Sequence, residues 1–502
     1  MLQTLISKLS RGLRESSSFG KRGNNFFGNM LALMSASIIS QAISLLASLA
    51  TAKLYTPAEM GIYSNYASIL SVITVSVCLE YNRAIILPDC KQDAKQVAAL
   101  CVAVCLGMST LCALVFLPFH DEIAIRMNAP ELSPWLCLMP VSMLLAGALS
   151  ILQCWNSRKK TLQNVALSNT VQTATSSGSQ ILLGLKPLHL YGGMICGNFI
   201  GRLISAVLLL WSTLRQETEA LFSGVTLTGV RQASVRYCRF LAAIPGGLCD
   251  QLCAALPSLG LTYFFGSAEA GYYGLGHRLL ALPLSIINTS VSQAFLPEAR
   301  DARAAGTLKP LCLRTMNLLL RIACTPFFLL SLVAPALISF VFGAKWYTAG
   351  EYIKWLSVWL LLGFVYSPLA CIFSVMEQPQ KYTVLSAVNL AVRAAALLVG
   401  GMVIGDPAIT IALCGVSGAL VSIFNCAYVL QLVGMHLGEI LSCIARQIFH
   451  ALLYTVPTFI SLSITGQNII SAIVAILSGC VFLLLETKPI LRSLQAIGKD
   501  EA

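Results

Sequence analysis

The sequence predicts an all-α polytopic membrane protein with about 14 transmembrane helices, arranged as two six-helix lobes and two extra C-terminal helices. Charged residues make up only 11% of the chain and hydrophobic residues 57%, whereas a soluble domain carries about 25% charged residues. Apolar runs of about 20 residues, the length that a helix needs to cross a bilayer, follow one another along the chain. In addition, a segment of the first half recurs in the second half.

The apolar runs are continuous rather than alternating, which favours helices over a β-barrel. The predicted spans are 28–50, 62–88, 96–118, 135–155, 163–185, 190–212, 241–265, 273–297, 314–342, 355–376, 382–404, 408–433, 447–465 and 468–487. The N-terminal segment has no apolar core, so it does not resemble a signal peptide. Its leucines recur at helical spacing with basic residues between them, which fits either an amphipathic helix on the inner leaflet or a solvated tail.

The basic residues indicate that both termini lie in the cytoplasm, because basic residues concentrate in cytoplasmic loops. With this orientation the cytoplasmic segments hold 23 of the 33 Lys and Arg residues, the outer segments hold five, and the spans hold five. The net charge of +12 is then mostly a topology signal, and nucleic-acid binding is not needed to explain it. Most of the 18 cysteines fall within spans and none forms a C-x-x-C pair, so we interpret them as small packing residues.

The repeated segment reads TPAEMGIYSNY in the first half and GSAEAGYYGLG in the second. Both copies contain A-E-x-G-x-Y, and Gly61 and Gly271 are 210 residues apart (271 − 61). At this offset eight of 23 positions are identical. The glycine suits a tight turn between helices. We interpret Glu59 and Glu269 first as residues that cap the following helix, because a negative charge is favoured at a helix N-terminus.

Each copy lies where one span ends and the next begins, so each repeat contains six spans. Because six is even, both repeats have the same orientation and should be related by a pseudo-twofold axis along the membrane normal. The predicted division is a cytoplasmic N-terminus 1–27, a first lobe 28–212, a cytoplasmic interlobe linker 213–240, a second lobe 241–433, and the last two spans with a cytoplasmic tail 434–502. We expect the last two spans to pack against the second lobe and to help form a groove for a lipid tail.

Three stretches resemble the polysaccharide-export flippases of the multidrug/oligosaccharidyl-lipid/polysaccharide exporter superfamily. They are AKLYTPAEMGIYSNYASI, FFGSAEAGYYGLGHRLLALPLSIINTSVSQAFLPEA and FGAKWYTAGEYIKWLSVWLLL, and they reach into both lobes. The resemblance implies a V-shaped bundle that works by alternating access. The implied cargo is an undecaprenyl-diphosphate-linked oligosaccharide, moved to the periplasmic face of the bacterial inner membrane for surface polysaccharides such as the O-antigen of lipopolysaccharide. Membrane lipids, a polysaccharide polymerase and a chain-length regulator would be its partners.

Five arginines lie inside predicted spans, and an ionised side chain at bilayer depth costs at least about 2.5–3.5 kcal/mol. These arginines are Arg83, Arg202, Arg278, Arg321 and Arg393. Against them we count only Glu80 and Asp250, which leaves an excess of three positive charges that ion pairs do not explain. Guanidinium groups bind phosphate oxygens in a forked geometry. The excess therefore predicts a cationic cavity that binds an anionic cargo.

The five arginines are not equivalent candidates for this cavity. Arg202 and Arg393 lie near the middle of their spans. Arg278 belongs to an R-L-x-x-x-P pattern that resembles the lipid II flippase branch, in which the matching arginine lines the central cavity. Arg321 is close enough to the cytoplasmic end of its span to snorkel. Arg83 is expected to pair with the glutamate three residues before it.

Three further observations concern residues near these arginines. Asp250 either pairs with an arginine across the lobes, which we favour, or binds a coupling cation such as H⁺ or Na⁺. His277 either senses protons or is only a polar residue at a helix end. Many relatives carry an R-Y-E order where this chain reads Glu80-Tyr81-Asn82-Arg83, so the resemblance assigns no role to that arginine.

Two other functions were weighed against lipid-linked oligosaccharide flipping. A cation-coupled multidrug exporter of the same superfamily would favour an acidic cavity, which the arginine excess opposes. A membrane polysaccharide polymerase or ligase would need a catalytic constellation at a membrane face, whereas the longest outer loop is the short HDEIAIRMNAPELSP. No G-x-x-x-x-G-K-[ST] motif is present, so the energy must come from an ion gradient, the cargo gradient or partners. No cofactor or metal is predicted.

Overall fold

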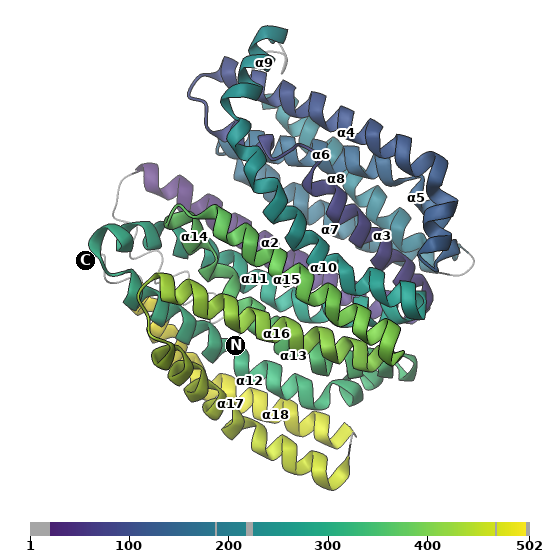
Figure 1. Cartoon of the computed structure of the whole chain (residues 1–502), viewed down its shortest axis with the longest axis vertical. Helices are drawn as coiled ribbons and strands as arrows, with labels where there is room; N and C mark the ends of the chain where they lie inside the picture. The colour runs from purple at the N-terminus through teal and green to yellow at the C-terminus, as the bar shows by residue number, and fades with distance from the viewer. Residues whose placement is uncertain (1–20, 186–187, 217–223, 467–468, 498–502) are drawn as a thin grey trace.

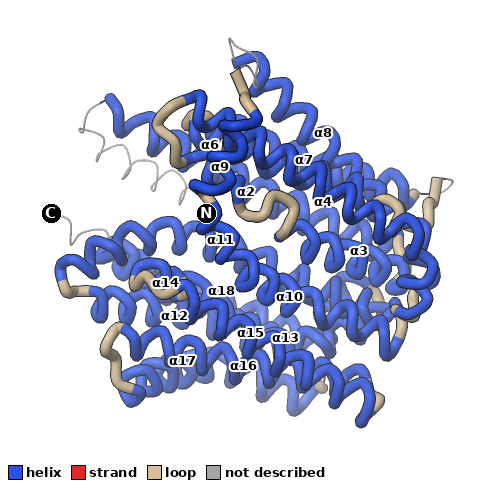
Figure 2. The backbone as a smooth tube through the Cα atoms, turned by 45° about the horizontal axis from the view of Figure 1, so that its top comes forward, coloured by secondary structure: helices blue, strands red, loops and turns tan. Residues whose placement is uncertain are grey.

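The computed structural model describes residues 21–185, 188–216, 224–466 and 469–497, and within these ranges every regular element is a helix (Figures 1 and 2). The all-α class predicted from the apolar runs is therefore confirmed. The amphipathic helix expected at the N-terminus lies for the most part outside the described residues.

The long helices follow the predicted spans in order. In the first half they are α2 (Lys21–Leu54), α3 (Pro57–Val75), α4 (Lys91–Arg126), α6 (Met139–Arg158), α7 (Leu162–Gly184) and α8 (Gly193–Gln216). In the second half they are α10 (Ile244–Phe265), α11 (Ser267–Ala305), α12 (Leu308–Phe342), α13 (Tyr347–Leu369), α15 (Pro379–Leu398), α16 (Pro407–Leu432), α17 (Leu437–Thr465) and α18 (Ile469–Ile497). Each predicted span overlaps one of these helices.

Short helices connect or extend the long ones. They are η1 (Tyr81–Ile86), η2 (Pro130–Leu132), α5 (Ser133–Leu136), α9 (Leu227–Arg236), η3 (Cys238–Ala243), η4 (Ala344–Trp346), α14 (Cys371–Val375) and the π-helix η5 (Val399–Ile404). Helix α9 belongs to the predicted interlobe linker and packs on α4.

Ten stretches of the described chain are long and apolar enough to cross a membrane, judged by length and composition. Helices α3, α7 and α11 are not among them, and in α18 the apolar part is the shorter stretch Ile470–Glu486. Helices α3, α7 and α11 each pack against several other helices, so they need less apolar surface than a helix that faces lipid. The chain is a multi-pass membrane protein, and the count of fourteen spans stays a prediction.

The helices form two lobes with separate hydrophobic cores. In the first lobe α7 packs against α2 and α8, and α6 packs against α4 and α8; in the second lobe α13 packs against α11, α12 and α16. One core lies entirely within residues 62–237, and the other draws mainly on residues from 261 onward. The lobes meet where α3 contacts α10 and α11 and where α2 contacts α11 (Figure 1). The domain boundaries proposed from the repeat stay a prediction.

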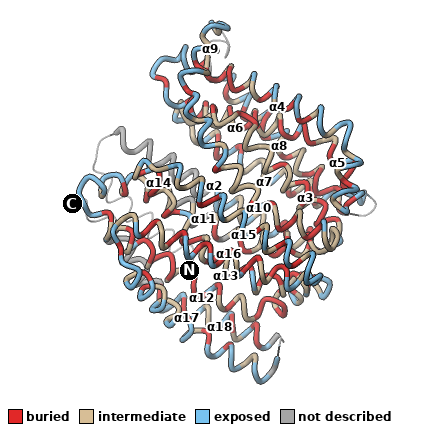
Figure 3. The backbone as a smooth tube through the Cα atoms, viewed as in Figure 1, coloured by how far each residue is buried: buried red, intermediate tan, exposed pale blue. Residues whose placement is uncertain are grey.

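Helices α17 and α18 pack against each other and against α12 of the second lobe, where the sequence placed them. Many residues of these outer helices and of α4 are exposed (Figure 3). Among them are large apolar residues such as Leu114, Phe449 and Leu484, which are 67%, 66% and 61% exposed. Exposed leucines and phenylalanines of this density are expected of a surface that faces lipid.

One predicted span differs from the structure. The span 62–88 was expected to be continuous, but α3 ends at Val75, and a turn leads into η1. Within this turn Leu79 has φ 48° and Glu80 has φ 61°, in the left-handed region that residues other than glycine rarely adopt. The break turns the chain back toward α4 and α6, which η1 contacts.

Candidate functional site

The two copies of the sequence repeat touch each other between the lobes. A Cβ atom added to Gly61 of α3 would lie 1.7 Å from the carbonyl oxygen of Ser267, and one added to Gly271 of α11 would lie 1.8 Å from that of Pro57. Ser267 and Pro57 are again separated by the repeat offset (267 − 57 = 210). Because the contact is reciprocal, a local twofold axis passes between the two glycines, as the repeat predicts.

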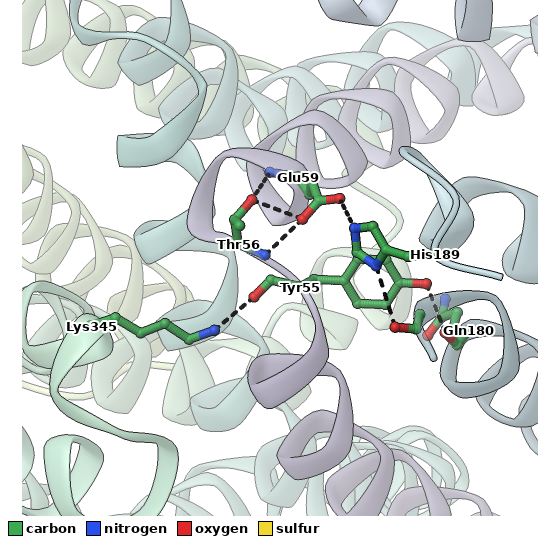
Figure 4. A network of polar contacts seen from close by, with 7 residues as sticks. Tyr55, Thr56, Glu59, Gln180, His189 and Lys345 are labelled. Atoms are coloured by element: carbon green, nitrogen blue, oxygen red, sulfur yellow. Dashed lines mark hydrogen bonds and ion pairs between the residues drawn. The ribbon is translucent and has the colours of Figure 1, made fainter. Parts of the chain in front are cut away.

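The second lobe also holds the end of α2. Lys345 Nζ donates a hydrogen bond to the carbonyl oxygen of Tyr55 at 2.9 Å (Figure 4), and Trp346 Nε1 donates to that of Ala52 at 2.9 Å. We call these two hydrogen bonds, together with the contact between Gly61 and Gly271, the gate. The gate closes the space between the lobes at the end that the basic residues predict to be periplasmic.

Glu59 orders the helix start beside the gate. Its Oε2 accepts hydrogen bonds from the backbone N–H and the hydroxyl of Thr56, both at 2.8 Å, and its Oε1 lies 2.9 Å from His189 Nε2 (Figure 4). The Thr56 hydroxyl accepts from the Glu59 N–H in turn, which completes a capping box. The capping role expected of Glu59 is confirmed. Its repeat equivalent Glu269 lies in the first turn of α11, where it accepts a hydrogen bond from the Tyr352 hydroxyl.

Three cavities follow α3 away from the gate. The first, which we call the deep cavity, has a volume of about 260 Å³ and is lined by residues that include Tyr63, Ser64, Tyr273, His277 and Arg278. It lies between α3 of the first lobe and α10 and α11 of the second. Both lobes therefore contribute to its walls.

The second cavity, the vestibule, has a volume of about 740 Å³ and lies at the other end of α3, near the linker. Its lining includes Arg83, Arg239, Asp250, Gln251 and Tyr382. The third cavity, the lobe pocket, has a volume of about 350 Å³ and lies within the first lobe. It shares Val75 and Glu80 with the vestibule, so the two spaces adjoin.

Two arginines reach these cavities with hydrogen-bond donors that no described residue accepts. Arg278 Nη1 and the Tyr273 hydroxyl are buried and unpaired at the deep cavity. Arg202 Nε is buried and unpaired at the lobe pocket. A buried donor without an acceptor is unfavourable by about 1–3 kcal/mol. Each guanidinium group therefore keeps a donor for which the described chain supplies no acceptor.

Arg393 lies elsewhere, although we expected it to face the cavity. Only 2% of it is exposed, its guanidinium carbon lies 3.8 Å from the ring centre of Trp359, and its Nη1 donates to the carbonyl oxygen of Cys253 at 3.1 Å. A cation over an aromatic face is stabilised by the ring quadrupole. Arg393 thus belongs to the interior of the second lobe and is not among the residues that line the three cavities.

Two other arginines have carboxylate partners. Arg321 Nε lies 2.6 Å from Oε2 of Glu486. The other oxygen of this carboxylate, Oε1, accepts a hydrogen bond from the Tyr454 hydroxyl at 3.3 Å. Our charge count missed Glu486, which lies near the end of the last predicted span, so the excess falls from three to two. Arg83 Nε lies 2.6 Å from Glu80 Oε2, as expected, and lines the vestibule.

Asp250 and His277, the two residues considered for ion coupling, both line cavities. Asp250 accepts a hydrogen bond from the Tyr382 hydroxyl, and no arginine of the described chain pairs with it, so the favoured pairing is wrong. His277 lines the deep cavity and stacks on Tyr273 with ring centres 5.6 Å apart. Among the residues described, no group of three possible metal ligands is present. The coupling ion stays undetermined.

The sequence reasoning missed the neutral polar residues around these cavities. Asn65 Nδ2 donates to Thr262 Oγ1 at 2.6 Å, and the hydroxyls of Ser64 and Ser258 lie 2.8 Å apart, so neutral side chains join the lobes next to the deep cavity. The signal was present in the composition of α3 and α7, which carry many serine, threonine and amide residues for spans. Because these residues are uncharged, counting the charges within the spans does not reveal them.

The two lobes thus meet at the gate, and the three cavities lie between and beside them along α3. The sequence matches the family model described as "Polysaccharide biosynthesis protein" over residues 50–351, and the chain belongs to this family. No curated protein matches the sequence.

The fold is similar to that of the lipid II flippase MurJ in an inward closed conformation, with a TM-score of 0.69 and 12% identity over 92% of this chain and 100% of that chain. It is also similar to an inward-facing multidrug resistance MATE family transporter of the MOP superfamily, with a TM-score of 0.63 and 13% identity over 80% of this chain and 98% of that chain. A third similar structure is a MOP superfamily transporter from Pyrococcus furiosus described by the reverse polarity of its binding pocket, with a TM-score of 0.56 and 15% identity over 81% and 95% of the two chains. The fold is therefore that of MOP superfamily transporters.

Proposed function

We propose that this transporter flips an undecaprenyl-diphosphate-linked oligosaccharide from the cytoplasmic to the periplasmic face of a bacterial inner membrane. The observation that carries the proposal is Arg278 in the deep cavity between the lobes, where its buried Nη1 has no acceptor among the described residues. Membership of a polysaccharide biosynthesis family supports a saccharide as part of the cargo. The two remaining positive charges suit a diphosphate, which offers several acceptor oxygens.

In the proposed mechanism the cargo binds while the gate is closed. Phosphate oxygens accept hydrogen bonds from the Arg278 guanidinium and the Tyr273 hydroxyl, whose donors are otherwise unpaired. The bound anion offsets the repulsion between the positive charges of the two lobes. The linker side of the cavity then closes, and the gate opens.

The gate suits such a movement because it holds no ion pair between the lobes. Gly61 and Gly271 contact backbone atoms only, and Lys345 donates to a neutral carbonyl oxygen. Separating the lobes here therefore breaks no direct ion pair among the described residues, and only the longer-range attraction between Lys345 and Glu59 is lost. Released cargo would pass to a polysaccharide polymerase and a chain-length regulator, which we propose as partners.

A cation-coupled multidrug exporter is the second candidate, since Asp250 offers a carboxylate to the vestibule. Vesicles that contain only this protein test the two functions. We expect a fluorescent undecaprenyl-diphosphate-linked saccharide to become accessible on the opposite face, and a cationic dye to stay where it is. Transport of the dye without the lipid would overturn the proposal.

A further inference from the structure

The lobe pocket is a separate space beside α3 rather than part of the deep cavity. Its volume of about 350 Å³ falls in the range of about 300–1,000 Å³ that small-molecule sites occupy. It is lined by Thr74, Val75, Val77, Cys78, Glu80, Asn82, Ala146, Leu149, Ser150, Gln153, Gln172 and Arg202, of which seven out of twelve are polar. The lobe pocket adjoins the vestibule, because Val75 and Glu80 line both spaces.

The pocket owes its shape to the break after α3. The left-handed backbone of Leu79 and Glu80 directs η1 toward α6, where Asn82 Nδ2 donates to the Ser150 hydroxyl at 2.7 Å. In the second lobe α11 runs on as a helix through the equivalent positions 286–290. The lobe pocket therefore breaks the pseudo-symmetry of the molecule. Strained backbone of this kind persists where the surrounding structure enforces it, often at functional sites.

The pocket wall offers amide and hydroxyl groups rather than a concentration of charge. Gln172 makes no side-chain hydrogen bond with any described residue, and Gln153 uses one amide N–H, which donates to Asn169 at 3.1 Å. The charge of Glu80 is already compensated by Arg83. An amide both donates and accepts, as does a sugar hydroxyl, whereas a diphosphate only accepts. A sugar therefore fits this wall better than a phosphate or a lipid tail does.

The geometry points to a sugar-binding subsite in the lobe pocket, distinct from the diphosphate subsite in the deep cavity. Gln153 and Gln172 bind the hydroxyl or acetamido groups of the first sugars, and Arg202 offers its unpaired Nε to a sugar oxygen. This inference rests on the proposed function, because it divides one cargo between two cavities. It assigns recognition of the sugar mainly to the first lobe.

Binding of two probes to the full chain in lipid nanodiscs tests the subsite. One probe is undecaprenyl diphosphate, and the other is the same lipid with N-acetylglucosamine attached. We expect Gln172→Leu to weaken binding of the sugar-bearing lipid about two- to tenfold, the loss expected for one hydrogen bond, and to leave binding of the bare lipid unchanged. Ser150→Ala, which frees Asn82, should act in the same direction. Gln431→Leu is the matched control, because this exposed residue of α16 lies outside the pocket.

The outcomes separate the subsite from the proposed function. A wild-type protein that binds neither lipid would overturn the proposed function. If the wild type binds both lipids and Gln172→Leu and Ser150→Ala alter neither affinity, the subsite is wrong and the proposed function stands. An equal loss for both lipids would place the diphosphate in the lobe pocket, which also overturns the inference.

Discussion

An arginine at bilayer depth needs an acceptor for its hydrogen bonds, and this chain supplies the acceptors in different ways. Arg321 has the carboxylate of Glu486, and Arg393 has an aromatic face and a carbonyl oxygen. Arg278 and Arg393 each keep one donor nitrogen that is buried and unpaired, but only Arg278 lines the deep cavity. Replacing Arg278 should therefore change lipid binding, whereas replacing Arg321 should change the stability of the protein.

Replacing Arg278 tests the diphosphate subsite. Arg278→Ala should weaken binding of undecaprenyl diphosphate about 10- to 150-fold, since a hydrogen bond to a charged group contributes about 1.5–3 kcal/mol. Arg278→Lys should restore only part of the affinity, because a point charge lacks the forked geometry. Arg126→Ala, at an arginine whose side chain is 78% exposed, serves as the control in the same titration. Wild-type affinity in the alanine variant would contradict the assignment.

Arg321 should behave as a structural residue instead. Arg321→Ala leaves Glu486, whose side chain is 6% exposed, without its main partner. Breaking a buried pair in this way destabilises a protein by about 3–5 kcal/mol. Thermal unfolding in detergent should show the loss, and the double change Arg321→Leu with Glu486→Leu should recover much of it. If Arg321→Ala keeps wild-type stability but loses lipid binding, the residue belongs to the cargo site after all.

At the scale of elements, the repeat predicted where the lobes would match but not where they differ. The A-E-x-G-x-Y motif predicted two equivalent helix starts, but not the crossing of α3 and α11 at Gly61 and Gly271. We expected these glycines in tight turns, whereas both lie within helices and allow the two backbones to approach each other closely. The break after Val75 was not foretold, since no glycine or proline marks it. It depends on the packing of η1 against α4 and α6, which sequence patterns do not record.

The glycine contact yields a prediction for the gate. Gly61→Ala should keep the gate from closing, because the added Cβ would lie 1.7 Å from the carbonyl oxygen of Ser267. This oxygen belongs to the backbone and can move only if the helix start moves with it. Spin labels attached through unnatural amino acids at the exposed positions Leu188 and Tyr347 report the separation of the lobes. We expect a longer distance in the variant. Gly107→Ala is the matched control, since nothing lies within 4 Å of its added Cβ; equal distances in both variants would contradict the prediction.

For the whole molecule, hydrophobic length predicted the order and placement of the helices well. Each predicted span overlaps a helix because a run of apolar residues in lipid must satisfy its backbone internally. The partners of the buried charges could not be predicted in the same way. Trp359 lies 34 residues before Arg393 (393 − 359), and Glu486 lies 165 residues after Arg321, so only the folded chain brings them together.

The last two helices form a further test at this scale. Among the described residues, their extensive contacts outside the pair are with α12 alone, so deleting residues 447–502 should leave both lobes inserted. Arg321→Leu must accompany the deletion, because Glu486 is lost with α18. We expect the shortened protein to bind undecaprenyl diphosphate but to transport it poorly, if these helices guide the lipid tail. Transport at the wild-type rate in vesicles would contradict that role.

The reciprocal contact at Gly61 and Gly271 also bears on the ancestry of the chain. In a homodimer of a six-helix protein, the same glycine of each subunit would meet across the twofold axis, and a single mutation would change both sides at once. In this single chain the two positions are separate targets for mutation, yet each lies against the backbone of the other copy. A side chain at either position would meet that backbone, so a glycine kept at one position does not compensate for its loss at the other.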